Sequence, residues 1–347
     1  MAEIAFILEN RRAIRRERVL RDREDPLAYS DDELIKRFRF PKAEILELFQ
    51  LIRPNLRNRF SRNQPLIPIM ELCAALRFYA KGAFQQDNGD TLGLSQPTIS
   101  KAIRNVTDSL LLHQSKFIRF PNLAEQRVVQ AGFYAMKGVP KVIGIIDGSH
   151  VFIRRPTTGP DEKLYVCRKG GHSINVQLVC DHDMKITDVV AKWPGSTHDA
   201  YIWRNCGLRE KFEANPPSGY LLGDSAYPLE PWMYTAILQP RTESELRHNV
   251  KIKGTRRLVE NAIGLLKSRF RCIDKSGGIL YYSPLKVSKY VVVCCMLHNK
   301  RRGLRLPEDE NLEGINTEND EEDENIYQGN VDHTTPLRQR LVDLLGA

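Results

Sequence analysis

At 347 residues, 41% of them hydrophobic, the chain is long enough for one large domain and a smaller one. Its net charge is +9, but residues 308–324 hold ten acidic and no basic residues, so the rest carries 52 basic against 33 acidic residues, a charge of +19. The lack of long apolar runs and of Cys-x-x-Cys pairs argues against a membrane protein, a disulfide framework and a structural zinc site, and fits a reduced intracellular compartment.

The strongly basic remainder favours a polyanionic partner, above all double-stranded DNA or another nucleic acid, over charge that serves only solubility. Residues 1–29 form a basic segment with seven arginines between Arg11 and Arg23, mixed with acidic residues. Such a segment suits a nuclear import signal or an arm that binds phosphates, and a solvated amphipathic helix explains it equally well.

Residues 30–135 have the pattern of a helical domain. Ser30-Asp-Asp-Glu33 resembles a capping box at the start of a helix, and two further helices are predicted at Lys42–Leu51 and Ile69–Lys81. Farther along, Gly93 is suited to end one helix and Ser95 to begin the next.

Apolar residues with helical spacing follow Ser95, so a helix, a tight turn and a second helix are predicted, as in a helix-turn-helix. Early in the second helix stand residues that suit base edges and phosphates, namely Gln96, Thr98, Lys101 and Arg104. An ordinary pair of packed helices has the same capping residues and is the alternative.

From residue 136 to 303 the pattern changes to strands followed by helices. The predicted strands are Val142–Ile146, Val151–Ile153, Ile174–Cys180, Ile186–Trp193 and Tyr220–Leu222, with a hairpin turn at Asp181–Met184. Helices are predicted at Arg256–Phe270 and Leu285–Leu297. In residues 304–347 the acidic stretch 308–324 is predicted to be disordered, and a final helix is predicted at Thr335–Leu345.

Two aspartates, Asp147 and Asp224, each follow an apolar run of strand-like composition, and Glu260 lies on the margin of the apolar stripe of a predicted helix. Such acids are costly near a core, and three together repel one another unless a cation neutralises them. Hard oxygen ligands favour Mg²⁺ or Mn²⁺, so a divalent-metal site for phosphoryl transfer is predicted. Lys267, two turns beyond Glu260, suits a phosphate.

For several other polar residues the sequence allows more than one role. Asp199 either supports the metal or caps the following helix, and the two explanations are equally good. His150, His172 and His198 could contact phosphate, but supporting or core roles explain each more simply, and His298 is predicted to be structural. Taken alone, Asp147 could cap a turn and Glu260 could be an ordinary surface residue.

Six motifs in this order resemble the PIF/Harbinger family of DDE transposases and the nucleases derived from them. They are Gly-Asp-Thr-Leu-Gly-Leu-Ser-Gln-Pro-Thr-Ile-Ser, Ile-Asp-Gly-Ser-His, Arg168-Lys-Gly-Gly-His-Ser-Ile-Asn-Val-Gln177, Pro-Gly-Ser-Thr-His-Asp, Leu-Gly-Asp-Ser-Ala-Tyr-Pro, and Val-Glu-Asn-Ala with Leu-Lys-Ser-Arg-Phe-Arg271. They span about residues 30–300, and the 35 residues between Asp224 and Glu260 match the spacing of such enzymes.

The resemblance implies an α/β ribonuclease H-like domain with a mixed sheet, preceded by the helix-turn-helix domain. It also implies that Asp147, Asp224 and Glu260 form the catalytic triad, that Asp199 is an additional metal ligand, and that two metals assist in-line attack on DNA. A nuclear location, terminal inverted repeats, an AT-rich trinucleotide target, a Myb/SANT-like partner protein and a homo-oligomer follow from the family as expectations. The leading interpretation is a transposase; a nuclease without transposition and a non-enzymatic DNA-binding regulator are the alternatives.

Overall fold

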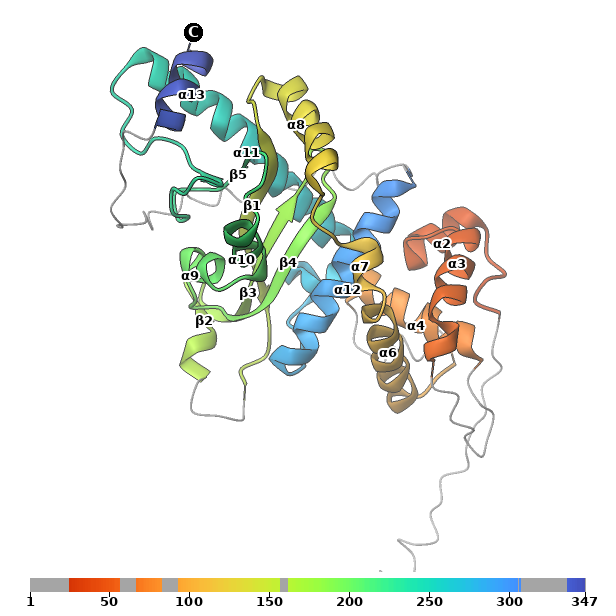
Figure 1. The fold of residues 1–347 in the computed structure, drawn as a ribbon. Coiled ribbons are helices and arrows are strands. Elements are labelled where there is room, and N and C mark those ends of the chain that lie inside the picture. The colour runs from red at the N-terminus through yellow and green to blue at the C-terminus, as the bar shows by residue number, and fades with distance from the viewer. Residues whose placement is uncertain are drawn as a thin grey trace, which may run out of the picture.

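The computed structural model describes residues 25–56, 67–82, 93–156, 162–304, 306 and 336–346, and Figure 1 shows its ribbon. A mixed sheet lies among helices on both faces. Its six strands are β1 (Val142–Phe152), β2 (Val166–Cys167), β3 (Gly171–Cys180), β4 (Ile186–Pro194), β5 (Tyr220–Leu222) and β6 (Met233–Tyr234). The basic segment before residue 25 and the acidic stretch 308–324 lie outside the described residues, so the predictions made for them stay predictions.

β1 is central in the sheet. It pairs with β3 in the antiparallel sense and with β5 in the parallel sense, while β4 pairs with the far side of β3 and β6 with β5. The hairpin predicted around Asp181–Met184 is confirmed, because the Asp181 carboxylate accepts the N–H groups of Asp183 and Lys185 between β3 and β4. This mixed sheet is consistent with the predicted ribonuclease H-like domain.

The prediction of two strands at Val142–Ile146 and Val151–Ile153 is wrong, because β1 is one continuous strand. Its pairing with β3 runs without a break from Ile145 opposite Cys180 to Phe152 opposite Ser173. The polar sequence Gly148-Ser-His150 resembles a turn, but the ladder to β3 satisfies its backbone groups and keeps it extended. Asp147 therefore lies within a strand and not at the end of one.

The helices are α2 (Asp31–Phe38), α3 (Lys42–Ile52), α4 (Pro68–Lys81), α6 (Gln96–Leu111), α7 (Gln114–Phe117), α8 (Leu123–Lys137), α9 (Asp199–Arg204), α10 (Gly207–Ala214), α11 (Glu243–Arg269), α12 (Pro284–Gly303) and α13 (Pro336–Gly346). Short 3₁₀ turns occur at η1 (Arg53–Asn55), η2 (Glu162–Tyr165), η3 (Arg271–Ile273) and η4 (Lys275–Gly277). The helices predicted near residues 42–51, 69–81, 285–297 and 335–345 are confirmed.

The predicted start of the helix at Arg256 is wrong, because α11 begins thirteen residues earlier, at Glu243. Thr242 and Glu245 form a capping box there, in which the Thr242 side chain accepts the Glu245 N–H and the Glu245 carboxylate accepts the Thr242 N–H. The first half of α11 is rich in charged residues and lacks the apolar periodicity on which the prediction relied. The long helix nevertheless packs across β1.

The two faces of the sheet pack against different helices. One face supplies Ile145 and Val151 to the larger core, which also includes residues of α11 and α12. The other face supplies Ile146 to a smaller core that contains Trp203 of α9 and Phe212 of α10. Because side chains alternate along β1, Asp147 is on the α11 face and Gly148 on the α9 face.

The N-terminal helices join the sheet through α12, which contacts β4 on one side and α6 and α7 on the other (Figure 1). The larger core is continuous across this junction, from Leu34 of α2 to Leu345 of α13. The division at residues 29, 135 and 303 into four parts stays a prediction. None of the helices in the described part of the chain combines the length and the apolar character needed to span a lipid bilayer.

Candidate active site

The register of β1 and β5 brings two of the predicted acids side by side. Ile145 of β1 pairs with Leu222 of β5 in this parallel ladder. Asp147 lies two residues after Ile145, and Asp224 lies two residues after Leu222, so the two aspartates occupy equivalent positions on neighbouring strands. Asp224 is held at the end of β5 because its carboxylate accepts the backbone N–H of Ala226 at 3.0 Å. Asp147 accepts the N–H of Gly148 at 2.9 Å. Backbone pairing therefore sets where both carboxylates lie.

Asp199, the first residue of α9, approaches from the opposite face of the sheet. The Asn175 side-chain amide on β3 donates to its carboxylate at 2.8 Å and to the Thr197 carbonyl at 2.8 Å. A Cβ atom at position 148 would lie only 2.6 Å from an Asp199 carboxylate oxygen. The carboxylate thus occupies the place where a side chain on β1 would otherwise be, and Gly148 is required for this close approach.

The three aspartates repel one another. Burial raises the pKa of Asp147 well above its usual range, and the negative charges of Asp224 and Asp199 raise it further. Arg256 on α11 acts in the opposite direction and lowers the same pKa. A buried carboxylate with two acidic neighbours is costly for stability, so this cluster is an expected feature of a functional site.

α11 supplies both an arginine and the predicted glutamate. The Arg256 guanidinium donates to the Glu260 carboxylate at 3.3 Å, one helical turn apart. Arg256 thus acts electrostatically on Asp147 while it is ion-paired with Glu260. The sequence analysis missed Arg256, although its spacing of four residues from Glu260 is the signal of a helical ion pair.

Tyr227 is a second residue that the sequence analysis missed. It is buried, and its hydroxyl oxygen has no hydrogen-bond partner among the described residues. Burial raises the pKa of Tyr227 well above its usual value, and the charges of Asp199, Asp224 and Asp147 contribute. Its position three residues after Asp224 was the available signal. A buried hydroxyl close to three carboxylates is a donor that the cluster can use.

The donor chemistry of this cluster fits a divalent cation. Carboxylate oxygens are the ligands that Mg²⁺ and Mn²⁺ prefer, and a cation would relieve the repulsion that raises the Asp147 pKa. Within the described residues, however, no three acidic, histidine or cysteine side chains stand at the spacing of a ready metal site. Glu260 forms an ion pair with Arg256, and this arginine would compete with a metal ion for the Glu260 carboxylate.

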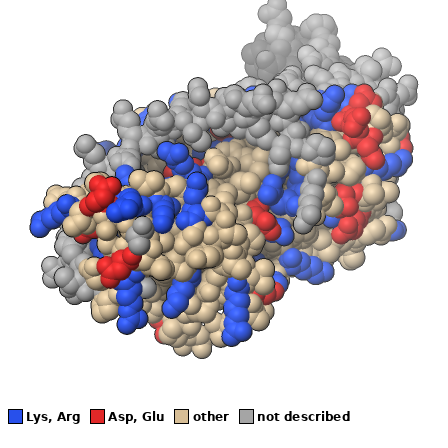
Figure 2. Space-filling view, turned by 90° about the horizontal axis from the view of Figure 1, so that it is seen from above, with Lys and Arg blue, Asp and Glu red and all other residues tan. Residues whose placement is uncertain are grey.

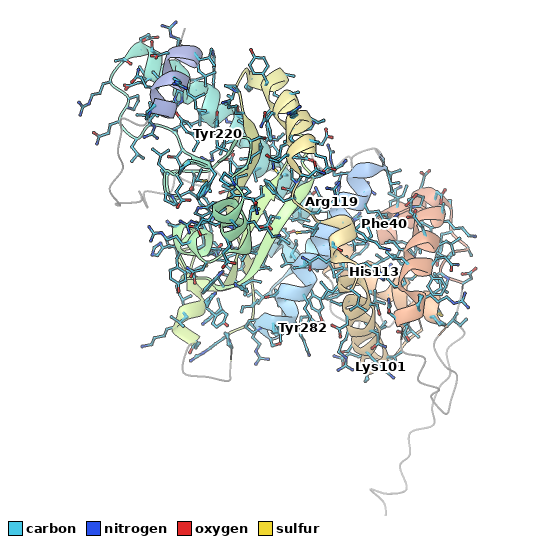
Figure 3. All side chains as sticks on the ribbon, in the orientation of Figure 1. Phe40, Lys101, His113, Arg119, Tyr220 and Tyr282 are labelled. Carbon is cyan, nitrogen blue, oxygen red and sulfur yellow. The ribbon has the colours of Figure 1, made fainter. Side chains whose placement is uncertain are left out.

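The predicted DNA-contacting residues lie on two helices. Gln96, Lys101 and Arg104 are exposed on α6, whereas the Thr98 hydroxyl is hydrogen-bonded to that of Ser95 at 2.8 Å. Lys267 is half-buried on α11. Figure 3 shows Lys101 far from Tyr220 of β5, the strand that leads to Asp224.

The second helix of the predicted helix-turn-helix is present as α6, which begins directly after Ser95. Residues 83–92, where the first helix was expected, lie outside the described residues; Gly93, expected to end that helix, has a left-handed φ of 63°. The helix-turn-helix therefore stays a prediction.

Three of the histidines noted in the sequence have partners outside the carboxylate cluster. His150 hydrogen-bonds to the Ser173 hydroxyl at 3.0 Å, and His172 hydrogen-bonds to Glu162 at 2.9 Å. His198 precedes the first residue of α9, and its side chain makes no capping hydrogen bond. Burial, together with nearby arginines, lowers the pKa of His298 to about 3, so this residue is neutral, and its ring bonds to the Met184 carbonyl. A structural role for His298 agrees with this setting.

Comparisons with known proteins identify the family to which the chain belongs. A family model described as DDE superfamily endonuclease matches residues 146–299. The human protein named Putative nuclease HARBI1 is 38% identical over 274 residues, which are 78% of this chain and 77% of the human protein. Its Xenopus laevis counterpart of the same name is 36% identical over 78% of both chains.

A plant protein is a more distant relative. Protein ALP1-like from Arabidopsis thaliana is 28% identical over 69% of this chain and 62% of its own length. No solved structure is a significant match. The predicted resemblance is confirmed: the chain belongs to the Harbinger transposase-derived family of DDE superfamily endonucleases.

Proposed function

We propose that this protein cuts DNA strands by metal-dependent phosphoryl transfer at the cluster of Asp147, Asp224 and Asp199, with Glu260 as the fourth acid. One observation carries the proposal. Three carboxylates from β1, the end of β5 and the start of α9 converge although their charges raise the pKa of Asp147. Such an arrangement opposes stability, and a bound divalent cation that meets a phosphate would offset this cost.

Each residue has a distinct part in this proposal. Asp147, Asp224, Asp199 and Glu260 would hold Mg²⁺ or Mn²⁺, which supplies activation of the attacking oxygen and stabilisation of the leaving oxygen. Asn175 keeps the Asp199 carboxylate against Gly148. Arg256 carries positive charge close to the aspartates and would bind a DNA phosphate once Glu260 turns to the metal. Lys267 would position a second phosphate.

The proposal also includes a second reaction, the joining of DNA strands. A transposase would cleave at terminal inverted repeats and join the ends to a target, assisted by a Myb/SANT-like partner protein, as a homo-oligomer in the nucleus. A nuclease without transposition is the second candidate, and it is favoured by the name of the relatives, which calls them nucleases. The regulator without enzyme activity is the least favoured, because all the acids are present.

The test uses purified protein and a supercoiled plasmid that carries candidate terminal repeats, with Mg²⁺, with Mn²⁺, or with EDTA. The proposal predicts nicked or linear products with either metal and none with EDTA. Asp147→Asn protein, purified in parallel, controls for a contaminating nuclease. Joined products with a second plasmid would identify a transposase, and cleavage alone would identify a nuclease. Intact plasmid under all metal conditions would overturn the proposal.

A further inference from the structure

Basic side chains are spread over the described surface, and Figure 2 shows several groups of them on one face. One group lies where α2, α4 and α11 end. We call it the helix-end cation cluster. Its members are Arg37, Arg39, Arg77, Lys81 and Arg271.

Hydrogen bonds and a close backbone contact hold the three helix ends together. The Arg39 guanidinium donates to the Arg269 carbonyl at the end of α11 at 2.9 Å, and to the Ala80 carbonyl near the end of α4 at 3.4 Å. Gly82 closes α4 in the left-handed conformation, with φ of 66°, and a Cβ atom there would lie 2.9 Å from the Arg271 carbonyl oxygen. Only glycine allows this approach without strain, and it brings Lys81 close to Arg271.

The cluster is strongly positive. Partial burial lowers the pKa of Lys81, and the positive charges of the other four cluster members lower it further. Burial also lowers the pKa of Arg77, and Arg37 contributes. The largest effects of neighbouring charges on the Lys81 pKa come from cations, with Arg77 first. The cluster thus holds five positive charges close together, although their mutual repulsion is unfavourable for the stability of the fold.

Helix ends by themselves attract cations, and this explains part of the cluster. The C-terminus of a helix carries roughly half a negative charge, so three ends offer about 1.5 charges against five cations. The carbonyl groups to which Arg39 donates explain its position, and the Arg37 guanidinium stacks 4.0 Å from the centre of the Tyr29 ring. Lys81 and Arg271 are exposed to solvent, and the attraction of helix ends for cations does not explain why these two also lie here.

We propose that the helix-end cation cluster binds phosphate groups of the DNA backbone, with Lys81 and Arg271 as the solvent-facing contacts. The inference rests on the proposed function, because it assumes DNA at the carboxylates. Glu260 lies nine residues before the end of α11 at Arg269, and a helical rise of 1.5 Å per residue places that end about 14 Å from Glu260 along the helix; Arg271 follows two residues later. Duplex DNA that reaches the carboxylates therefore extends far enough to meet the cluster. The cluster is separate from the residues predicted on α6.

The test measures binding of a 30-base-pair duplex, in EDTA to prevent cleavage, across a series of salt concentrations. The double variant Lys81→Gln/Arg271→Gln removes two exposed cations. A matched control, Lys116→Gln/Arg340→Gln, removes two exposed cations on α7 and α13. Each lost phosphate contact lowers the slope of log affinity against log salt by about 1, so the cluster variant should lose about 2 and bind every sequence more weakly. The control should keep the wild-type slope.

The melting temperature separates DNA binding from a merely structural role. Because the cluster holds like charges, the variant should melt at the same temperature as the wild type or higher. A lower melting temperature with an unchanged salt slope would overturn the proposal and leave these residues as caps of helix ends. Failure of the proposed function is distinguishable, since it would appear as a wild-type protein that never cleaves, whatever the salt slope of the cluster variant.

Discussion

The aspartates and Glu260 reach the candidate site by different routes. Asp147 and Asp224 are set in place by the pairing of β1 with β5, and Asp199 is fixed by the Asn175 amide. Glu260 stands on a helix, and its long side chain pairs with Arg256. The sheet and α9 thus hold three acids together at a cost in repulsion, whereas in the proposed mechanism the helix supplies a fourth acid that exchanges Arg256 for the metal.

The largest expected effect is on cleavage. Asp147→Asn and Glu260→Gln should each lower the rate of DNA cleavage by at least about 1000-fold, because metal ligands act as a unit. The double variant should be hardly worse than either single one. Plasmid cleavage measures the rates, and circular dichroism confirms folding. A folded Glu260→Gln protein that cleaves at the wild-type rate would break the comparison, since only the aspartates would then be needed.

A smaller effect is expected from closing the gap beside Asp199. In Gly148→Ala the new methyl group would lie within 2.6 Å of the Asp199 carboxylate and displace it. We expect a loss of about 10- to 100-fold in metal affinity or activity, as for disturbed supporting contacts at metal sites. Gly207→Ala is the matched control, because a Cβ atom there meets no atom within 4 Å. Equal losses in both variants would show a general effect on folding.

The ion pair on α11 can be tested without DNA. In Arg256→Gln, Glu260 loses its partner and a positive charge near the aspartates disappears. The rise in melting temperature caused by Mn²⁺ should therefore be larger in this variant than in the wild type. Arg257→Gln on the exposed side of α11 should respond to Mn²⁺ like the wild type. A smaller response in Arg256→Gln would show that the arginine organises the acids instead of competing with the metal.

The smallest expected effect concerns pH and requires metal-free protein. The pKa of Asp147 is raised in the folded state, so its favourable contribution to stability is present below the unfolded-state pKa and is lost as pH rises through the folded value. In EDTA, Asp147→Asn should therefore become more stable than the wild type as pH rises toward neutral. Urea unfolding at several pH values gives the difference. A constant difference in stability at every pH would contradict the raised pKa.

The sequence predicted some of the strands better than others. Apolar composition located the strands at 174–180, 186–193 and 220–222, and the hairpin between the first two. The segments 174–180 and 220–222 are buried along their whole length, whereas 186–193 is buried only in part. It did not reveal that β1 continues through Gly148-Ser-His150, since only pairing with β3 keeps these polar residues extended. Tertiary pairing, and not local propensity, decides such a segment.

The sequence predicted the acidic residues of the candidate site but not the residues that surround them. Asp147 and Asp224 follow apolar runs that any reader of the sequence finds, and their convergence agrees with the parallel register. Arg256 and Asn175 were not predicted to matter, because their importance depends on which side chains face each other across elements. The capping box at Thr242 was a readable signal for the true start of α11.

The most direct test of this account is calorimetric titration of Mn²⁺ into wild-type, Asp147→Asn and Glu260→Gln proteins at one pH. In the proposed site Glu260, on its helix, joins the aspartates at a bound metal. Both variants should therefore lose about tenfold or more in Mn²⁺ affinity relative to the wild type. Wild-type affinity in Glu260→Gln, together with a loss in Asp147→Asn, would contradict the claim and confine metal binding to the three aspartates.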